Sequence, residues 1–134
     1  RYLLYAEGDY GQFHIWHASA DLWVKALERD SCYALTEANS PEADSYHTCS
    51  SNGRWIVFAS RRDDAGFSRV YISYFDTQGC AHRPIMLPQR RALHNTLLLK
   101  SYNVPELVKH RVPSTQQQLQ EAVMLQEATK ATYK

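Results

Sequence analysis

Short apolar runs alternate with polar, glycine-containing segments along the first 90 residues. Two runs have the same form, because an arginine opens a nearly continuous apolar stretch at 1–5 and again at 54–58. Short apolar runs that contain aromatic and β-branched side chains and are bounded by turn residues are typical of buried β-strands. The pattern therefore predicts a chain built mainly of strands.

The likeness between these two runs extends to the segments that come after them. Each run precedes a polar loop, then a second strand candidate (21–27 and 69–75), then a turn and a third short candidate (32–36 and 83–87). Equivalent segments lie about 50 residues apart, a period typical of propellers and other repeat arrays. The sequence predicts two copies of one β-unit.

The second copy has an additional strand candidate at 45–50, directly before Asn52-Gly53. Asn-Gly tolerates the positive φ angles of a two-residue hairpin loop, so we expect 45–50 to pair with 54–60. The second unit then has four antiparallel strands, the content of one propeller blade, whereas the first has three and lacks its opening strand. Burial on both faces, as between stacked blades, explains why 55–59 does not alternate.

Beyond Pro88 the apolar pattern becomes irregular, and helix signals appear only near the C-terminus. Pro113-Ser114 followed by Gln117 has the form of a capping box. Residues 116–130 are rich in helix-forming side chains and have a ragged apolar side. The sequence predicts a C-terminal helix that is marginal alone and needs a surface to lie on.

Several of these segments together resemble one repeat family. The run 45–64, with 71–76, 84–89 and 102–106, resembles the TolB-like β-propeller repeat, in particular the last blades of bacterial envelope members. The resemblance covers most of residues 1–112. It departs from the usual repeat where Asn52 replaces an aspartate and Cys49 an aromatic residue.

The resemblance implies an all-β fold of antiparallel four-stranded blades, with a short C-terminal helix. This chain supplies about two blades of a propeller of about six or seven. We expect it to be a fragment, with the remaining blades from the missing chain or from other copies. The expected parts are an incomplete penultimate blade, a last blade, a closing segment and a helical tail, at 1–40, 41–90, 91–112 and 113–134.

The composition is that of an ordinary globular domain. The chain has 134 residues, 44% of them apolar and 22% charged, and a formal net charge of +1. This balance argues against nucleic acid as a partner, because phosphate binding normally requires a basic surplus. No apolar run approaches the roughly 18 residues that a membrane-spanning helix needs. No cofactor is indicated.

The three cysteines are Cys32, Cys49 and Cys80, widely spaced and odd in number. They include no C-x-x-C pair and indicate neither a zinc site nor a complete disulfide framework. A single disulfide bridge, with the third cysteine as a free thiol, is still compatible with the sequence. Cys49, on a predicted strand, is expected to be a buried small apolar side chain.

The candidate binding site is the charge cluster Arg61, Arg62, Asp63 and Asp64, directly after the second apolar run. Two arginines suit a carboxylate, and two aspartates supply part of a Ca²⁺ site. A calcium site needs about six or more oxygens, however, and only two carboxylates are close in sequence. We expect a solvated blade corner whose charges pair with one another and with the backbone. It is the first place to look for a partner.

Other chemistry is weakly indicated. His14 and His17 are three apart, and in a strand or loop they would point to opposite faces, so no metal pair is predicted. The sequence contains no G-x-S-x-G nucleophile elbow. Glu42 and Asp44 are expected to be loop charges rather than an acid and base pair. No catalytic residue is predicted.

The predicted function is a non-enzymatic propeller scaffold of the bacterial cell envelope that binds a protein or peptide at a blade rim or central channel. The resemblance implies a periplasmic or outer-membrane-associated protein, a lipoprotein in full length. The alternative is the propeller portion of a prolyl-type peptidase or oligosaccharide lyase, with its catalytic residues outside this chain. Exposed Trp and Tyr side chains leave glycan binding as a third interpretation.

Overall fold

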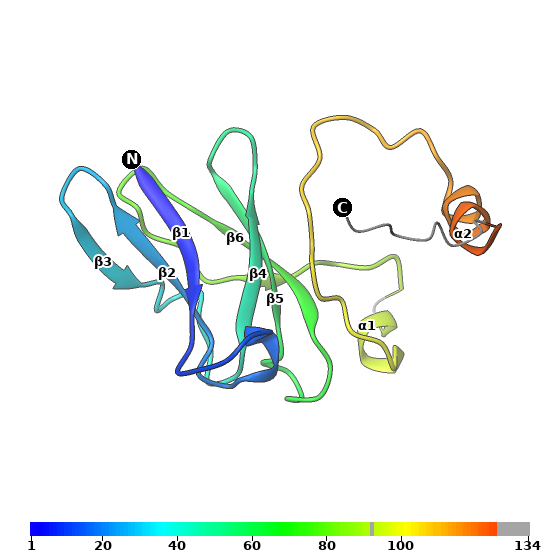
Figure 1. Ribbon diagram of the computed structural model, residues 1–134, viewed down its shortest axis with the longest axis horizontal. Coiled ribbons are helices and arrows are strands. Elements are labelled where there is room, and N and C mark those ends of the chain that lie inside the picture. The colour runs from blue at the N-terminus through cyan, green and yellow to red at the C-terminus, as the bar shows by residue number, and fades with distance from the viewer. Residues whose placement is uncertain (92, 126–134) are drawn as a thin grey trace, which may run out of the picture.

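The computed structural model describes residues 1–91 and 93–125, and these form two antiparallel β-sheets (Figure 1). Sheet 1 has the order β1-β2-β3 and sheet 2 the order β4-β5-β6-β7. The predicted β-rich architecture, with one three-stranded and one four-stranded unit, is confirmed. The strands are β1 (Tyr2–Glu7), β2 (Asp21–Ala26), β3 (Ser31–Ala34), β4 (Asp44–Cys49), β5 (Trp55–Ser60), β6 (Arg69–Tyr74) and β7 (Ile85–Met86).

The two longest hairpins have the same strand register. The ladder of β1 with β2 begins at the pair Tyr2 and Ala26, and that of β5 with β6 begins at the pair Trp55 and Tyr74. Each continues without a break for six pairs. The repeat seen in the sequence is therefore also a repeat of hydrogen-bond pairing, residue for residue.

The main core lies between the two sheets. Alternating residues of β2, such as Leu22 and Val24, are fully buried, because the pleat turns every second side chain toward sheet 2. In β5 every residue from Ile56 to Ser60 is buried, so this strand is covered on both faces. The buried cluster consists of Leu22, Val24, Leu35, Ala38, Ile56, Phe58, Tyr71, Phe75 and Ala81.

The hairpin between β4 and β5 differs from the prediction. A two-residue Asn-Gly loop was expected, but Ser50 N donates to Trp55 O, so the loop has four residues. Of its residues only Gly53 has a positive φ, of 65°, and its N–H donates to Ser50 O at 2.8 Å. The Ser50 hydroxyl accepts from the N–H of Trp55 at 2.9 Å. This side chain closes the loop that Asn-Gly was expected to form alone.

Strand β4 carries a bulge that the sequence did not predict. Ser45 pairs with Ala59 and Thr48 with Val57, which leaves Tyr46 and His47 opposite one residue of β5. Tyr46 adopts a φ of 52°, in the left-handed region. Bulges turn side chains away from the regular alternation. The His47 ring here lies near the backbone of Leu4 in sheet 1.

The helices are short. Helix η1 (His14–Trp16) is a 3₁₀ turn between β1 and β2, and α1 (His94–Leu97) is one turn of α-helix; the sequence predicted neither. Helix α2 (Gln116–Leu125) confirms the C-terminal helix, but its reciprocal cap is formed by Thr115 and Gln118 rather than Ser114 and Gln117. The predicted remainder to 130 lies outside the described residues.

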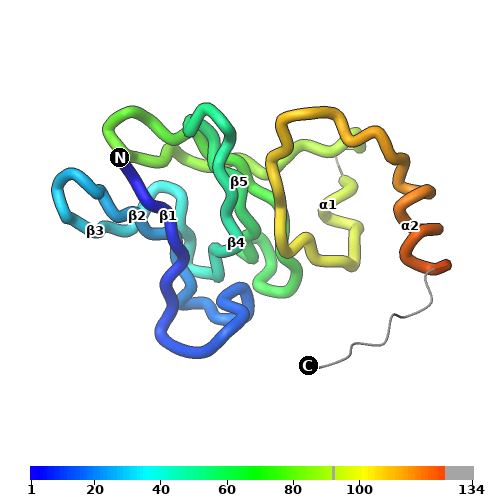
Figure 2. Tube along the Cα trace, turned by 45° about the horizontal axis from the view of Figure 1, so that its top comes forward, coloured from blue at the N-terminus to red at the C-terminus, as the bar shows by residue number. Residues whose placement is uncertain are grey.

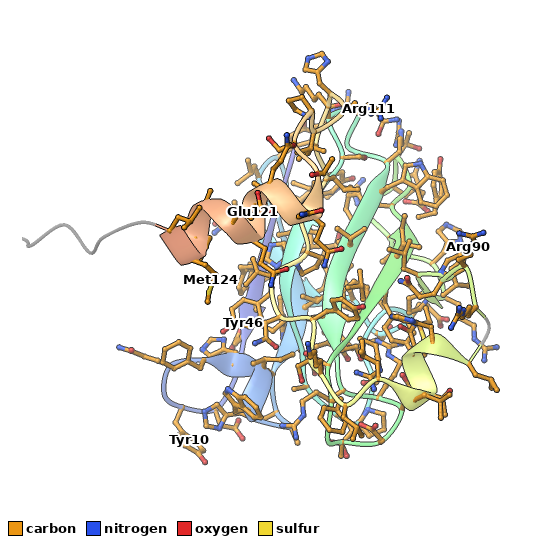
Figure 3. All side chains as sticks on the ribbon, turned by 90° about the vertical axis from the view of Figure 1, so that its right-hand side faces the viewer. Tyr10, Tyr46, Arg90, Arg111, Glu121 and Met124 are labelled. Carbon is orange, nitrogen blue, oxygen red and sulfur yellow. The ribbon has the colours of Figure 1, made fainter. Side chains whose placement is uncertain are left out.

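Helix α2 contributes nothing to the core. Every described residue of α2 is exposed, and Glu121 and Met124 project from it (Figure 3). It therefore does not lie on the surface that its sequence was expected to need. Among the described residues, none of the helices has the length and apolar character required to cross a bilayer.

Residues 98–107, here called the strap, run along the side of sheet 2 that faces away from sheet 1 (Figures 1 and 2). The strap is held at the start of β6. The Tyr102 N–H donates to Ser68 O at 3.0 Å, and the Ser68 hydroxyl donates to Tyr102 O at 2.8 Å. The buried Arg69 guanidinium donates to Lys100 O at 2.7 Å and to Leu98 O at 3.0 Å. Leu98 follows α1, so Arg69 also caps that helix, as cations favour helix C-termini.

Candidate functional site

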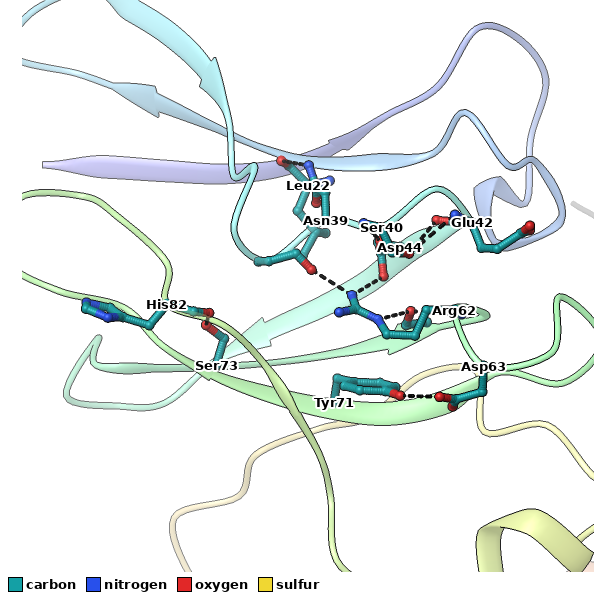
Figure 4. Close-up of polar contacts among 12 residues, drawn as sticks. Leu22, Asn39, Ser40, Glu42, Asp44, Arg62, Asp63, Tyr71, Ser73 and His82 are labelled. Atoms are coloured by element: carbon teal, nitrogen blue, oxygen red, sulfur yellow. Dashed lines mark hydrogen bonds and ion pairs between the residues drawn. The ribbon is translucent and has the colours of Figure 1, made fainter.

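The four residues predicted as a solvated corner follow the end of β5, at the end of the sheet interface where β4 begins. The structure places Arg62 differently from that prediction. Its side chain is only 17% exposed, and its guanidinium lies 2.7 Å from the Asp44 carboxylate, which is fully buried (Figure 4). Asp44 was expected to be a loop charge, but it is the first residue of β4 and half of a buried ion pair.

The Asp44 and Arg62 pair takes part in several further hydrogen bonds. Arg62 also donates to Ala38 O at 2.6 Å and to the Ser60 hydroxyl at 2.8 Å. The second Asp44 oxygen accepts from the N–H and hydroxyl of Ser40, at 2.6 and 2.8 Å. Buried charges need this degree of pairing, because their desolvation is costly. The network joins the β3–β4 connection to the end of β5.

Arg62 also lies over the aromatic side chains of sheet 2. Its guanidinium carbon is 4.4 Å from the centroid of the Tyr71 ring and 5.5 Å from that of Phe58. Cation–π contact of this kind is strongest where water is excluded. Arg62 is therefore part of the interface between the sheets, and its guanidinium is not free to bind a partner.

The other three residues of the cluster bind within their own loop and to the elements next to it. Asp63 accepts a hydrogen bond from the Tyr71 hydroxyl at 2.8 Å, and Asp64 accepts from the N–H groups of Gly66 and Phe67, both at 2.8 Å. Arg61 donates to the carbonyl oxygens of Ala65 and Gly66 and to that of Ile15 in η1, where its guanidinium carbon also lies 5.0 Å from the centroid of the Trp16 ring. The expected contacts with the backbone are present, but the predicted pairing of these charges with one another is wrong, since the ion pair runs to Asp44.

The pKa shifts agree with this geometry. Burial raises the pKa of the Tyr71 hydroxyl, and the hydrogen bond to Asp63 raises it further. The N–H groups of Phe67 and Gly66 lower the pKa of Asp64, because they stabilise the carboxylate. Tyr71 is thus a hydrogen-bond donor at neutral pH and Asp64 an acceptor. Both groups have structural roles.

The histidine and cysteine residues differ from expectation in two respects. His14 is the first residue of the 3₁₀ helix η1 and His17 directly follows that helix, and the His17 ring packs on Tyr10 with centroids 4.6 Å apart. Cys49 is exposed rather than buried, and all three cysteines are free thiols. Within residues 1–91 and 93–125, no group of three or more His, Cys, Asp or Glu side chains gathers as a metal site would require.

The opposite end of the sheet interface is open. A pocket of about 330 Å³ lies there, where β1 begins, β4 and β6 end and the β4–β5 hairpin turns. Its apolar lining includes Leu4 and the rings of Tyr2 and Phe75, which pack edge to face at 5.6 Å. The charged residues of the wall are Arg54, Asp76 and Arg1, the last of which pairs with Glu28 at 3.8 Å, and Asn52 adds an amide.

The polar groups of this pocket differ in how many of their hydrogen bonds and ion pairs are already formed within the chain. Asp76 accepts from the N–H groups of Gln78 and Cys80 and lies 3.4 Å from the His82 ring, and the bond from Cys80 is the largest cause of its lowered pKa. The Asn52 oxygen accepts from the N–H of Arg54 at 3.1 Å. In the described part of the chain, no carboxylate forms an ion pair with the Arg54 guanidinium. This pocket therefore offers an apolar floor beside an available cation, which suits an apolar group next to a carboxylate.

Comparison with known protein families, with curated proteins and with solved structures found no match to this chain.

Sequence reasoning missed both Asp44 and Arg54 as functional candidates. For Asp44 a signal was present. In the predicted hairpin, regular pairing through the Asn-Gly turn places Asp44 opposite Arg61 and beside Arg62, and in the structure the bulge shifts Asp44 by one position, opposite Ser60. For Arg54 no signal existed, because the pocket is formed by three segments that are distant in sequence.

Proposed function

We propose that this chain belongs to a non-enzymatic, TolB-like β-propeller scaffold of the bacterial envelope, with sheets 1 and 2 as neighbouring blades. The proposal is supported first by the matched ladders. Because the β1–β2 and β5–β6 registers correspond pair by pair, Leu4 is equivalent to Val57 and Tyr5 to Phe58. The envelope location rests on the resemblance of the sequence alone.

The main support for stacked blades is that equivalent faces of the two sheets point in the same direction. Phe58 faces sheet 1, whereas its equivalent Tyr5 lies on the far face of sheet 1, one position along from core-facing Leu4. Likewise Leu4 faces sheet 2, and its equivalent Val57 lies on the far face of sheet 2, toward the strap. A two-fold sandwich would bring equivalent faces together, while head-to-tail stacking keeps them in one direction. Head-to-tail stacking is what successive blades around a ring require.

The position of the strap determines whether a further blade can pack on sheet 2 and close a ring. A further blade would pack on the far face of sheet 2, and the strap covers that face here. The strap and a further blade therefore compete for one surface. In a closed ring the strap lies elsewhere, and its anchors at Ser68 and Arg69 are exchanged for contacts with the next blade.

The open pocket is the proposed point of contact for a protein or peptide partner at a blade rim. An apolar side chain of the partner fits against Tyr2, Leu4 and Phe75, and an adjacent carboxylate pairs with Arg54. Arg62 and Asp44 hold the other end of the interface closed. The partner thus meets two blades where they diverge.

A peptide selection tests this function. A library of random heptapeptides is selected on the immobilised chain, and bound peptides are measured by fluorescence anisotropy. We expect enrichment of an aromatic or aliphatic residue next to Asp, Glu or a free C-terminal carboxylate. Arg54→Ala should weaken binding about tenfold or more, because a hydrogen-bonded ion pair is lost.

Arg83→Ala provides the matched control, since Arg83 is an exposed arginine outside the pocket. It should leave the affinity unchanged. A library without enrichment, or peptides that bind the wild type and Arg54→Ala equally well, would rule out the proposed site.

A further inference from the structure

A second cavity, of about 290 Å³, lies between the strap and the far face of sheet 2. Its floor is the apolar row Val57, Val70 and Ile72, from β5 and β6. The strap residues Tyr102 and Leu107 contribute to the opposite wall. The volume is near the lower limit for small-molecule sites, which is roughly 300 Å³. This cavity shares no residue with the pocket proposed for peptides.

One polar side chain in its wall lacks a partner. Asn95 of α1 is only 9% exposed; its amide nitrogen lies 3.0 Å from Met86 Sδ and 3.5 Å from Leu87 O, while its Oδ1 atom accepts no hydrogen bond. Reversing the amide does not remove the deficit, because Nδ2 would then be the unpaired atom. Buried polar groups without partners are uncommon in folded proteins. An unpaired acceptor beside an apolar cavity is matched by a ligand that brings a donor.

We propose that this cavity binds a small molecule with an apolar body and one N–H or O–H donor, of the class of benzyl alcohol. The apolar body replaces empty space over Val57 and Ile72, and the donor pairs with Asn95 Oδ1. The exposed Glu106 carboxylate in the cavity wall disfavours anions. The ligand is therefore a neutral or cationic alcohol or amine.

Access to the Asn95 oxygen requires local movement. Oδ1 has almost no accessible surface, so a donor in the cavity reaches it only when the residues around it, which in the cavity wall include those of the strap, move aside. The strap is fastened near Ser68 and Arg69 and passes over the cavity at 105–107. Bound ligand then adds contacts between strap and sheet and slows the opening of this segment.

The test compares three probes, benzyl alcohol, toluene and benzoate, titrated into the whole chain and followed by two-dimensional NMR. Benzyl alcohol should bind about tenfold more tightly than toluene, since a hydrogen bond is formed in a dry site. Benzoate should bind more weakly than either. Backbone amide exchange in 102–107 should slow with benzyl alcohol present.

Two variants separate the role of Asn95 from that of the cavity. Asn95→Leu should abolish the preference for benzyl alcohol over toluene, and Val70→Phe, which fills the floor, should weaken both probes while Asn95 stays in place. Gln117→Ala, an exposed amide on α2, is the control and should change neither. If Asn95→Leu does not fold, the Val70→Phe result and the amide exchange still show whether the probes bind in this cavity.

The proposal is overturned by equal affinity of wild type for toluene and benzyl alcohol, by no binding of either, or by tighter binding of benzoate. The cavity exists only while the strap, rather than a further blade, covers the far face of sheet 2. Its test is separate from the peptide selection, because the two sites have no lining residue in common.

Discussion

The two faces of sheet 2 are buried by different means. One face packs on sheet 1, where Phe58 and Ile56 are 0% and 1% exposed and the Asp44 and Arg62 pair closes one end. The other face is covered by the strap, which is fastened at Ser68 and Arg69 but leaves a cavity of about 290 Å³ over the middle of the sheet.

The difference shows what a second sheet supplies and an extended segment does not. Side chains of two pleated sheets have matching spacing and interdigitate to the density of a crystal. An irregular strap satisfies its hydrogen bonds at the sheet edge, but its side chains have no common period with the strands beneath. The first face therefore gives a filled core, and the second gives room for a ligand.

The largest expected effect is at the closed end of the filled face. Asp44→Ala leaves the Arg62 guanidinium without its carboxylate and the Ser40 N–H and hydroxyl without their acceptor. We expect the free energy of unfolding to fall by about 3–5 kcal/mol, as for other broken buried pairs. Urea unfolding measures it, with the exposed Asp9→Ala as the control. A loss no larger than the control's would mean that the pair does not hold the interface.

The second-largest effect is a difference in stability between two variants, each with an isoleucine changed to alanine on one face of sheet 2. Ile56→Ala, on the filled face, should cost about 4 kcal/mol, within the range for fully buried aliphatic side chains. Ile72→Ala, on the strap face, should cost less than about 2 kcal/mol, because this half-buried side chain already borders a cavity. Chemical denaturation of both variants gives the comparison, and equal losses would contradict it.

A smaller effect is expected at the fastening of the strap. Ser68→Ala removes the hydroxyl that donates to Tyr102 O, at a cost of about 1 kcal/mol. Hydrogen exchange should accelerate in 101–107 while the amides of β2 keep their protection, since the strap opens locally. The control is Ser73→Ala, whose buried hydroxyl donates to His82 O instead. Uniform acceleration across both sheets would argue that strap and core unfold together.

The smallest effect concerns the pH dependence of the filled face. Burial lowers the pKa of His47 below its ordinary value of 6.5, and the nearby backbone of Leu4 only partly opposes this. The unfolded chain then binds the proton more readily, so stability is lost as the pH falls below 6.5. His47→Gln should flatten this decline between about pH 7 and about pH 5. The exposed His110→Gln should not, and an unchanged slope in His47→Gln would refute the assignment.

The strands were predictable from the sequence because each carries a local signal. All seven strands of the described chain fall where short apolar runs and turn residues indicated them, although β7 is only Ile85–Met86 of the expected 83–87. Helices η1 and α1 were missed because a single turn is too short to show a period. The propeller ring and its partner stay predictions.

The candidate sites were less predictable, since each depends on segments far apart in the chain. The charges at 61–64 were visible in the sequence, but whether Arg62 pairs with its neighbours or with a buried carboxylate depends on how β4 lies against β5. The Arg54 pocket and the Asn95 cavity have no local signature, because their walls come from separate strands and from the strap.

The amino-acid sequence by itself determined the strands, their antiparallel order and the repeat of a β-unit, because apolar periodicity and turn residues act over a few neighbouring positions. Only the tertiary structure decided which faces meet, that Asp44 is buried against Arg62, and that the strap covers the far face of sheet 2. The physical reason is that the burial of a side chain depends on the element packed against it. A charge that would be solvated in an isolated loop becomes part of the core when a second sheet encloses it.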